Sequence, residues 1–211
     1  MHHKFNQLHG IDLACVRGEE TIFSELEVHA KSAEVVQLQG ANGSGKTSLL
    51  RILCGISQPA EGSVRWNDIE IATEAEGFRR EIGYVGHRRG VCEDLTPLEN
   101  VLFANALGTP RPEAECLQAL TRLGLAHVAG IPTRLLSAGQ NQRTALARLL
   151  VSDAACWFLD EPFTALDRGG REVIEAVIAE HAAAGGISIV ATHQPMTLTD
   201  TNVRTLQLDR T

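Results

Sequence analysis

The sequence is poor in aromatic residues, which make up 4% of its 211 positions. Proteins that bind single-stranded nucleic acid stack bases on aromatic side chains, and few such platforms can be built here. Positive charge is also scarce, because 19 Lys and Arg stand against 26 Asp and Glu, a net charge of −7. A nucleic-acid backbone is bound mainly through clustered cations, so we expect no nucleic-acid partner.

Long apolar runs and paired cysteines are absent as well. No segment approaches the roughly 18 apolar residues that a membrane span needs, and no apolar run follows the N-terminal charges, so we expect no signal peptide. The cysteines are odd in number and form no CxxC pair. This pattern is typical of reduced thiols in a cytosolic protein, mostly packed as small apolar side chains. They are Cys15, Cys54, Cys92, Cys116 and Cys156.

Short apolar runs alternate with helical patterns along much of the chain. Residues 11–16 and 22–28 predict antiparallel strands, and residues 35–39 predict a buried strand. Helices are predicted over residues 47–54 and 170–184. Further strands are expected at residues 63–66, 82–85, 156–159, 187–191 and 204–208. This alternation predicts an α/β fold with a mostly parallel core sheet, preceded by an antiparallel β part.

The middle of the chain carries helical patterns only, over residues 97–106, 112–123 and 138–151. Two of these begin at or near a proline, as helices often do. We expect one domain over residues 1–211, because no repeat or flexible linker interrupts it. Its core lobe would comprise about residues 1–89 and 153–211, with a helical lobe inserted at about residues 90–152.

A glycine-rich loop joins the strand at residues 35–39 to the next helix and fits the phosphate-binding motif GxxxxGK[ST]. Glycines let backbone N–H groups face phosphate oxygens, and the helix N-terminus adds positive potential. Lys46 adds a cation near the β- and γ-phosphates, and the Thr47 hydroxyl is a hard ligand for Mg²⁺. The motif predicts a P-loop NTPase that binds Mg-ATP or Mg-GTP, and alone it fits a kinase, a GTPase or a motor. The candidate nucleotide-binding residues are Gly40, Ala41, Asn42, Gly43, Ser44, Gly45, Lys46, Thr47 and Ser48.

Two adjacent acids end the apolar strand at residues 156–159. Because neighbouring side chains of a strand point to opposite sides, Asp160 can face the Mg²⁺ shell while Glu161 projects toward the γ-phosphate. We predict that Asp160 holds the cation through water and that Glu161 acts as general base on the attacking water. Acids at strand ends are common, and the prediction depends on the phosphate loop.

A third motif, LSAGQ, occupies residues 136–140. Ser137 fits the N-cap of the helix that follows, which is a sufficient structural explanation. A serine hydroxyl, a glycine N–H and a helix N-terminus can also form a second γ-phosphate site, with Ser137, Gly139 and Gln140 as candidates. The motif lies far along the chain from Lys46, which favours a head-to-tail homodimer with ATP between the two motifs.

In combination, these motifs resemble the ATP-binding subunits of ABC transporters over the whole chain. The resemblance implies that Glu161, His193 and Lys46 are catalytic, that His193 contacts the γ-phosphate, and that Asp167 links the two sites of the dimer. His87 stands where the family usually has a glutamine, and its neutral imidazole could accept a hydrogen bond from a Mg²⁺-bound water. No aromatic residue lies near positions 13–17 to stack on adenine, and Arg17 could stack or be a solvated surface residue.

Residues 62–66, 86–90, 94–100 and 192–195 resemble one branch of this family, the ATP-binding subunits of the bacterial haem exporter of cytochrome c maturation. That branch implies ATP hydrolysis that drives a membrane complex releasing a haem-loaded chaperone. It also implies an integral membrane partner and a peripheral position at the cytoplasmic face of the inner membrane. The chain has no CxxCH, so we expect no direct haem binding and assign no haem or metal to His2, His3 or His9.

Three other functions are compatible with parts of the sequence. An ABC transporter with another cargo would carry the same motifs. A soluble ABC-type ATPase acting on nucleic acid usually has two cassettes or basic arms, whereas this chain has one cassette and net negative charge. A regulatory subunit that binds nucleotide without hydrolysis is disfavoured, because Glu161 and His193 are both present.

Overall fold

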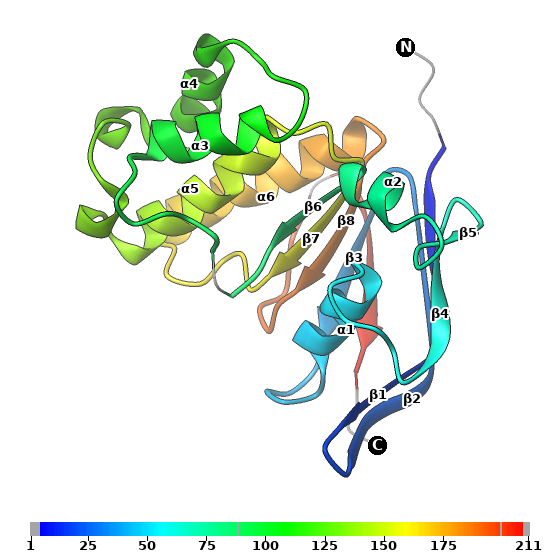
Figure 1. Ribbon diagram of the computed structural model, residues 1–211. Coiled ribbons are helices and arrows are strands. Elements are labelled where there is room, and N and C mark those ends of the chain that lie inside the picture. The colour runs from blue at the N-terminus through cyan, green and yellow to red at the C-terminus, as the bar shows by residue number, and fades with distance from the viewer. Residues whose placement is uncertain (1–4, 88, 199, 209–211) are drawn as a thin grey trace.

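A five-stranded parallel sheet forms the centre of the molecule, as the computed structural model shows for residues 5–87, 89–198 and 200–208 (Figure 1). Its strands are β6 (Ile82–Val85), β7 (Cys156–Asp160), β8 (Ile187–Ala191), β3 (Glu34–Gln39) and β9 (Asn202–Gln207), in that spatial order. Every neighbouring pair in this order is parallel. The predicted α/β fold with a parallel core sheet is therefore confirmed.

A second, antiparallel sheet has the order β2-β1-β4-β5. Its strands are β1 (Gln7–Arg17), β2 (Glu20–Lys31), β4 (Glu61–Trp66) and β5 (Ile69–Glu70). The predicted strands at residues 11–16 and 22–28 are confirmed but are longer than predicted. The β1–β2 register shifts between Gly10 and Val16, and these irregularities blur the alternation of apolar side chains in the sequence.

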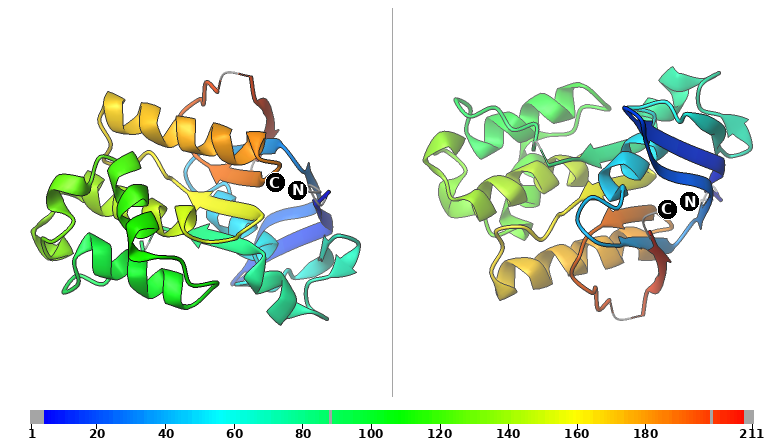
Figure 2. Two further views of the ribbon diagram at one scale, coloured as in Figure 1. Left: turned by 90° about the horizontal axis from the view of Figure 1, so that it is seen from above. Right: turned by 90° about the horizontal axis from the view of Figure 1, so that it is seen from below.

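Helices cover both faces of the parallel sheet. On one face, α1 (Lys46–Leu53) lies between the two sheets, where Leu49, Leu53 and Phe158 share a core. On the other face, α5 (Ala138–Leu150) and α6 (Arg168–Ala183) pack in a second core with Leu159 and Val190 (Figure 2). Because strands β7 and β8 are buried on both faces, their sequences are mostly apolar and do not alternate between apolar and polar residues.

Helices α3 (Pro97–Ala106) and α4 (Glu113–Arg122) pack on α5 and on each other. The predicted helices of this region agree with the structure to within one residue at each end. Both α3 and α5 begin with a capping box, formed by Thr96 with Glu99 and by Ser137 with Gln140. Within the described residues, none of the helices has the length and apolar character that crossing a membrane requires.

Four short elements were not predicted: β5, α2 (Ala75–Arg80), η1 (Ala126–Val128) and η2 (Thr133–Leu135). Phe78 is the one buried residue of α2, so this helix has no apolar periodicity to detect. The cysteines are free thiols; four are buried as predicted, and Cys92 is exposed. His2 and His3 lie outside the described residues.

Candidate functional site

The loop at residues 40–45 joins the end of β3 to the start of α1, whose first residues, Lys46 and Thr47, complete the phosphate-binding motif. Gly45 has a φ of 96°, and a side chain there would also approach Ile22 to within 2.6 Å, so glycine is required. Helix α1 begins without a side-chain cap or an acidic residue in its first turn, which leaves its N-terminal amides available. The buried Lys46 side chain donates from Nζ to the carbonyls of Gly40 at 2.7 Å and Ala41 at 2.9 Å. The loop therefore offers backbone donors and one cation to an anion.

Strand β7 delivers Asp160 to the same loop. The Thr47 hydroxyl donates to Asp160 Oδ1 at 3.1 Å, across 113 residues of sequence. Asp160 is 4% exposed, and its Oδ2 has no hydrogen-bond partner among the described residues. Burial raises the pKa of the Asp160 carboxyl, while the hydrogen bond from Thr47 opposes this rise. A buried carboxylate with a free oxygen beside a hydroxyl is a suitable environment for a divalent cation.

Glu161 leaves the strand in the left-handed region, with a φ of 50°. Such a conformation is costly for a residue with a side chain and occurs mostly where the surroundings impose it. Here the Glu161 N–H donates to the carbonyl of Ala191 at the end of β8, at 2.8 Å. His193 lies two residues beyond Ala191, and its Nδ1 is 3.1 Å from Glu161 Oε2. The carboxyl ends of β7 and β8 thus bring these two predicted catalytic residues together.

A cavity of about 440 Å³ unites the loop and the acids. His87, which follows β6, lines it and lies close enough to Asp160 to lower the pKa of that carboxyl. Arg17, from the end of β1, also lines it and is exposed. The cavity is lined by Arg17, Ile22, Asn42, Gly43, Gly45, Lys46, Thr47, Ser48, His87, Asp160 and Glu161.

The LSAGQ residues and Asp167 do not line this cavity. Ser137 is exposed and caps α5, since its hydroxyl accepts from Gln140 N at 3.2 Å while Gln140 Oε1 accepts from Ser137 N at 2.8 Å. Asp167 caps α6 by accepting from Gly170 N at 2.8 Å. The two caps are neighbours, because a side chain on Gly139 would meet the carbonyl of Ala165 at 2.6 Å. One chain therefore presents two separate groups of predicted site residues.

Comparisons with known proteins identify the family of this chain. A sequence model of the ABC transporter family matches residues 23–164. The chain belongs to the ABC transporter family.

Curated relatives within the ABC transporter family are similar over nearly their full length. The chain is 41% identical to the cytochrome c biogenesis ATP-binding export protein CcmA of Nitrosospira multiformis, over 95% of this chain and 98% of that protein. It is also 41% identical to the protein of the same name from Escherichia coli K12, over 95% of each. A solved ATP-binding cassette, a dimer bound to ADP and Pi in a post-hydrolysis state, is 26% identical with a TM-score of 0.83, over 96% of this chain and 97% of that one.

As a member of the ABC transporter family, the chain is an ATP hydrolase. This confirms the resemblance drawn from its motifs and decides between the NTPase classes that the phosphate loop left open. Sequence reasoning missed the side chains that support the site of this ABC transporter subunit. Gln37 could have indicated such a supporting side chain, because it is a polar residue in the apolar strand β3. It is 2% exposed, and a buried amide must find hydrogen-bond partners.

Proposed function

We propose that this chain is the ATP-hydrolysing subunit of an export complex in cytochrome c biogenesis, the role named in its curated relatives. The observation that carries the proposal is the meeting of the phosphate loop with the ends of β7 and β8, through the contacts Thr47–Asp160 and Glu161–His193. Conversion of ATP to ADP and phosphate needs a phosphate cradle, a cation site and a base, and these residues provide all three.

Each residue of the site has a distinct proposed role. Lys46 and the loop amides bind the phosphates, and Glu161 accepts the proton of the water whose oxygen attacks the γ-phosphorus. As that bond forms, the bond from the γ-phosphorus to the bridging oxygen breaks, and ADP leaves. His193 contacts the γ-phosphate and is held near the base by its 3.1 Å contact with Glu161.

The donor set also fits Mg²⁺, because Asp160 has a buried, unpartnered carboxylate oxygen beside the Thr47 hydroxyl. Thr47, Asp160 and His87 would hold the ion, partly through water. When bound, Mg²⁺ neutralises charge on the β- and γ-phosphate oxygens. Burial raises the pKa of Asp160, and a nearby cation would favour its ionised form.

We further propose that two chains form a head-to-tail homodimer around ATP. Ser137, Gly139 and Gln140 would then close the phosphate loop of the other copy, and Asp167 would connect the two sites. The exposed Ser137 end of α5 supports this proposal, and so does the dimeric arrangement of one related cassette in two solved structures. In this arrangement, residues 90–152 would act as a helical lobe that carries Ser137 to the partner.

The proposed complex includes an integral membrane subunit, and the chain would lie peripherally at the cytoplasmic face of the bacterial inner membrane. We expect neither nucleic acid nor haem to bind the chain directly. The proposal is tested by co-purification from detergent-solubilised membranes of the native host, with mass spectrometry of the bound proteins. Membrane subunits of cytochrome c biogenesis are the expected result. An unrelated permease would refute the biogenesis role and leave an ABC ATPase with another cargo, whereas absence of any membrane partner would refute the transport role.

A further inference from the structure

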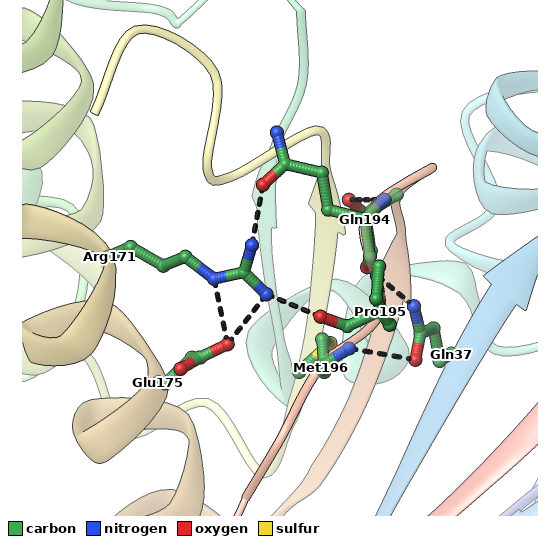
Figure 3. Close-up of polar contacts among 7 residues, drawn as sticks. Gln37, Arg171, Glu175, Gln194, Pro195 and Met196 are labelled. Atoms are coloured by element: carbon green, nitrogen blue, oxygen red, sulfur yellow. Dashed lines mark hydrogen bonds and ion pairs between the residues drawn. The ribbon is translucent and has the colours of Figure 1, made fainter. Parts of the chain in front are cut away.

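The segment that follows His193 is held from two directions (Figure 3). From β3, the buried Gln37 side chain donates to the carbonyl of Gln194 at 2.8 Å and accepts from Met196 N at 3.4 Å. From α6, Arg171 Nη1 donates to Gln194 Oε1 at 2.6 Å, and Nη2 donates to the carbonyl of Pro195. The two residues directly after His193 are therefore bound to one guanidinium group.

The same guanidinium also contacts the segment that carries Glu161. Its carbon lies 5.0 Å from the ring centre of Phe163, which is 3% exposed and two residues beyond Glu161. Glu175, one turn further along α6, accepts from Arg171 Nε at 3.0 Å and from Nη2 at 2.9 Å. The planar, five-donor fork of arginine can maintain all these contacts in one orientation, which a lysine cannot.

His193 itself has little packing to fix its position. Its side chain is 57% exposed, and its described polar contact is the 3.1 Å approach to Glu161. On its N-terminal side, the buried Thr192 donates its N–H to the carbonyl of Leu38 at 3.3 Å. The direction of the His193 ring therefore depends on the backbone of residues 192–196. Arg171 and Gln37 hold the C-terminal part of this segment, residues 194–196.

We propose that Arg171 is a positioning residue for ATP hydrolysis. Packed against Phe163 and paired with Glu175, it holds the segment that follows His193 and so sets the position of His193 relative to Glu161. It acts on the γ-phosphate through His193. This inference rests on the proposed function, in which His193 serves the hydrolytic step. A displacement of about 1 Å in such a group can slow a reaction by about 100-fold.

Helix α6 contains a matched control for this role. Arg168 and Glu172 form an ion pair with the same spacing as Arg171 and Glu175, but the Arg168 side chain is 94% exposed. Among the residues that the structure describes, its side chain forms a hydrogen bond only with Glu172. Loss of Arg168 removes an exposed helix pair of small energetic value. Loss of Arg171 also removes the hydrogen bonds to the Gln194 side chain and the Pro195 carbonyl.

The test is single-turnover and steady-state ATP hydrolysis by the full chain and its variants. Arg171→Met is expected to lower kcat by about 10- to 100-fold with less than about twofold change in KM, because the phosphate loop is untouched. Arg168→Met is expected to match the wild type. In a His193→Ala background, Arg171→Met is expected to change the rate by less than about twofold, since its effect passes through His193.

Three results would overturn the inference: an unchanged kcat in Arg171→Met, a rise in KM alone, or an equal loss of rate with and without His193. If Arg171→Met does not fold, Gln194→Ala removes the acceptor of the 2.6 Å contact and must reproduce the selective loss of kcat. Failure of the proposed function gives a different result. Equal hydrolysis by the wild type and His193→Ala would refute the role of His193, whereas a slow His193→Ala beside a fast Arg171→Met refutes the positioning role alone.

Discussion

Acidification should destabilise this protein through one histidine of α6. The imidazole of His181 stacks on the indole of Trp157, with ring centres 3.8 Å apart and planes at 4°. Burial lowers the pKa of His181 from 6.5 to about 4, while hydrogen bonds with the backbone of Ile187 and Ala155 oppose this. A side chain on Gly186 would meet the ring at 2.3 Å, so the ring packs closely against the turn that leads into β8.

The size and direction of the effect follow from this pKa. Below pH 6.5 the unfolded chain binds a proton at His181, whereas the folded chain remains neutral there until about pH 4. Stability due to the neutral ring is therefore complete above pH 6.5 and is lost as the pH falls toward 4. At about 1.4 kcal/mol per pH unit, the whole interval corresponds to about 3 kcal/mol, and about 2 kcal/mol is lost by pH 5.

Urea unfolding of the wild type and His181→Phe at pH 7.5 and pH 5 measures this term. Phenylalanine keeps an aromatic ring against Trp157 but cannot bind a proton. The free energy of unfolding of the wild type should fall by about 2 kcal/mol more than that of the variant between these pH values. The exposed His127, replaced by glutamine, serves as the control and should follow the wild type. An equal fall in the free energy of unfolding of the wild type and His181→Phe would show that His181 is not the source of the acid sensitivity.

Two further predictions concern the nucleotide site. Ser137→Arg should abolish ATP-driven dimerisation in analytical ultracentrifugation, because it places bulk where the γ-phosphate of the partner site must lie. Thr96→Arg removes the equivalent cap of α3 and should leave the dimer intact, so equal behaviour of the two variants would contradict the head-to-tail arrangement. Asp160→Asn should raise the Tm of the nucleotide-free chain at pH 7, because burial raises the pKa of Asp160 above 3.8 and the folded state disfavours its charge. This gain in Tm should shrink as the pH falls toward 3.8. Mg-ATP should raise the Tm of the variant less than that of the wild type. An equal rise would exclude Asp160 from the cation site.

The strands of the parallel sheet and the helices could be predicted where a pattern within one short segment of sequence was sufficient. The helix α3 was predicted at its observed bounds, because a helical pattern starts at Pro97 and proline is common in the first turn of a helix. Short α2, with Phe78 as its buried residue, gave no such signal. The order of the strands was not predictable either, since β3 lies between β8 and β9, which follow it by some 150 residues in the sequence. Apolar periodicity reports burial of a strand and carries no information about its neighbours.

The candidate site could also be predicted only in part. The phosphate loop is one continuous motif, so Lys46 and Thr47 could be placed from the sequence. The 3.1 Å approach of Thr47 to Asp160 was expected only because both motifs were present. Arg171 escaped prediction because its spacing to Glu175 resembles an ordinary helix ion pair. Its contacts with residues 194 and 195 depend on how α6 packs beside the end of β8, which no local pattern encodes.

Substitution of Glu161 by glutamine tests most directly whether Glu161 is the general base for ATP hydrolysis at this site. Glu161→Gln is expected to bind Mg-ATP as the wild type does, to hydrolyse it about 10²- to 10⁴-fold more slowly, and to accumulate an ATP-bound dimer. Glu172→Gln, on the exposed face of α6, serves as the control and should hydrolyse ATP at the wild-type rate. Undiminished ATP turnover by Glu161→Gln would show that Glu161 is not the general base.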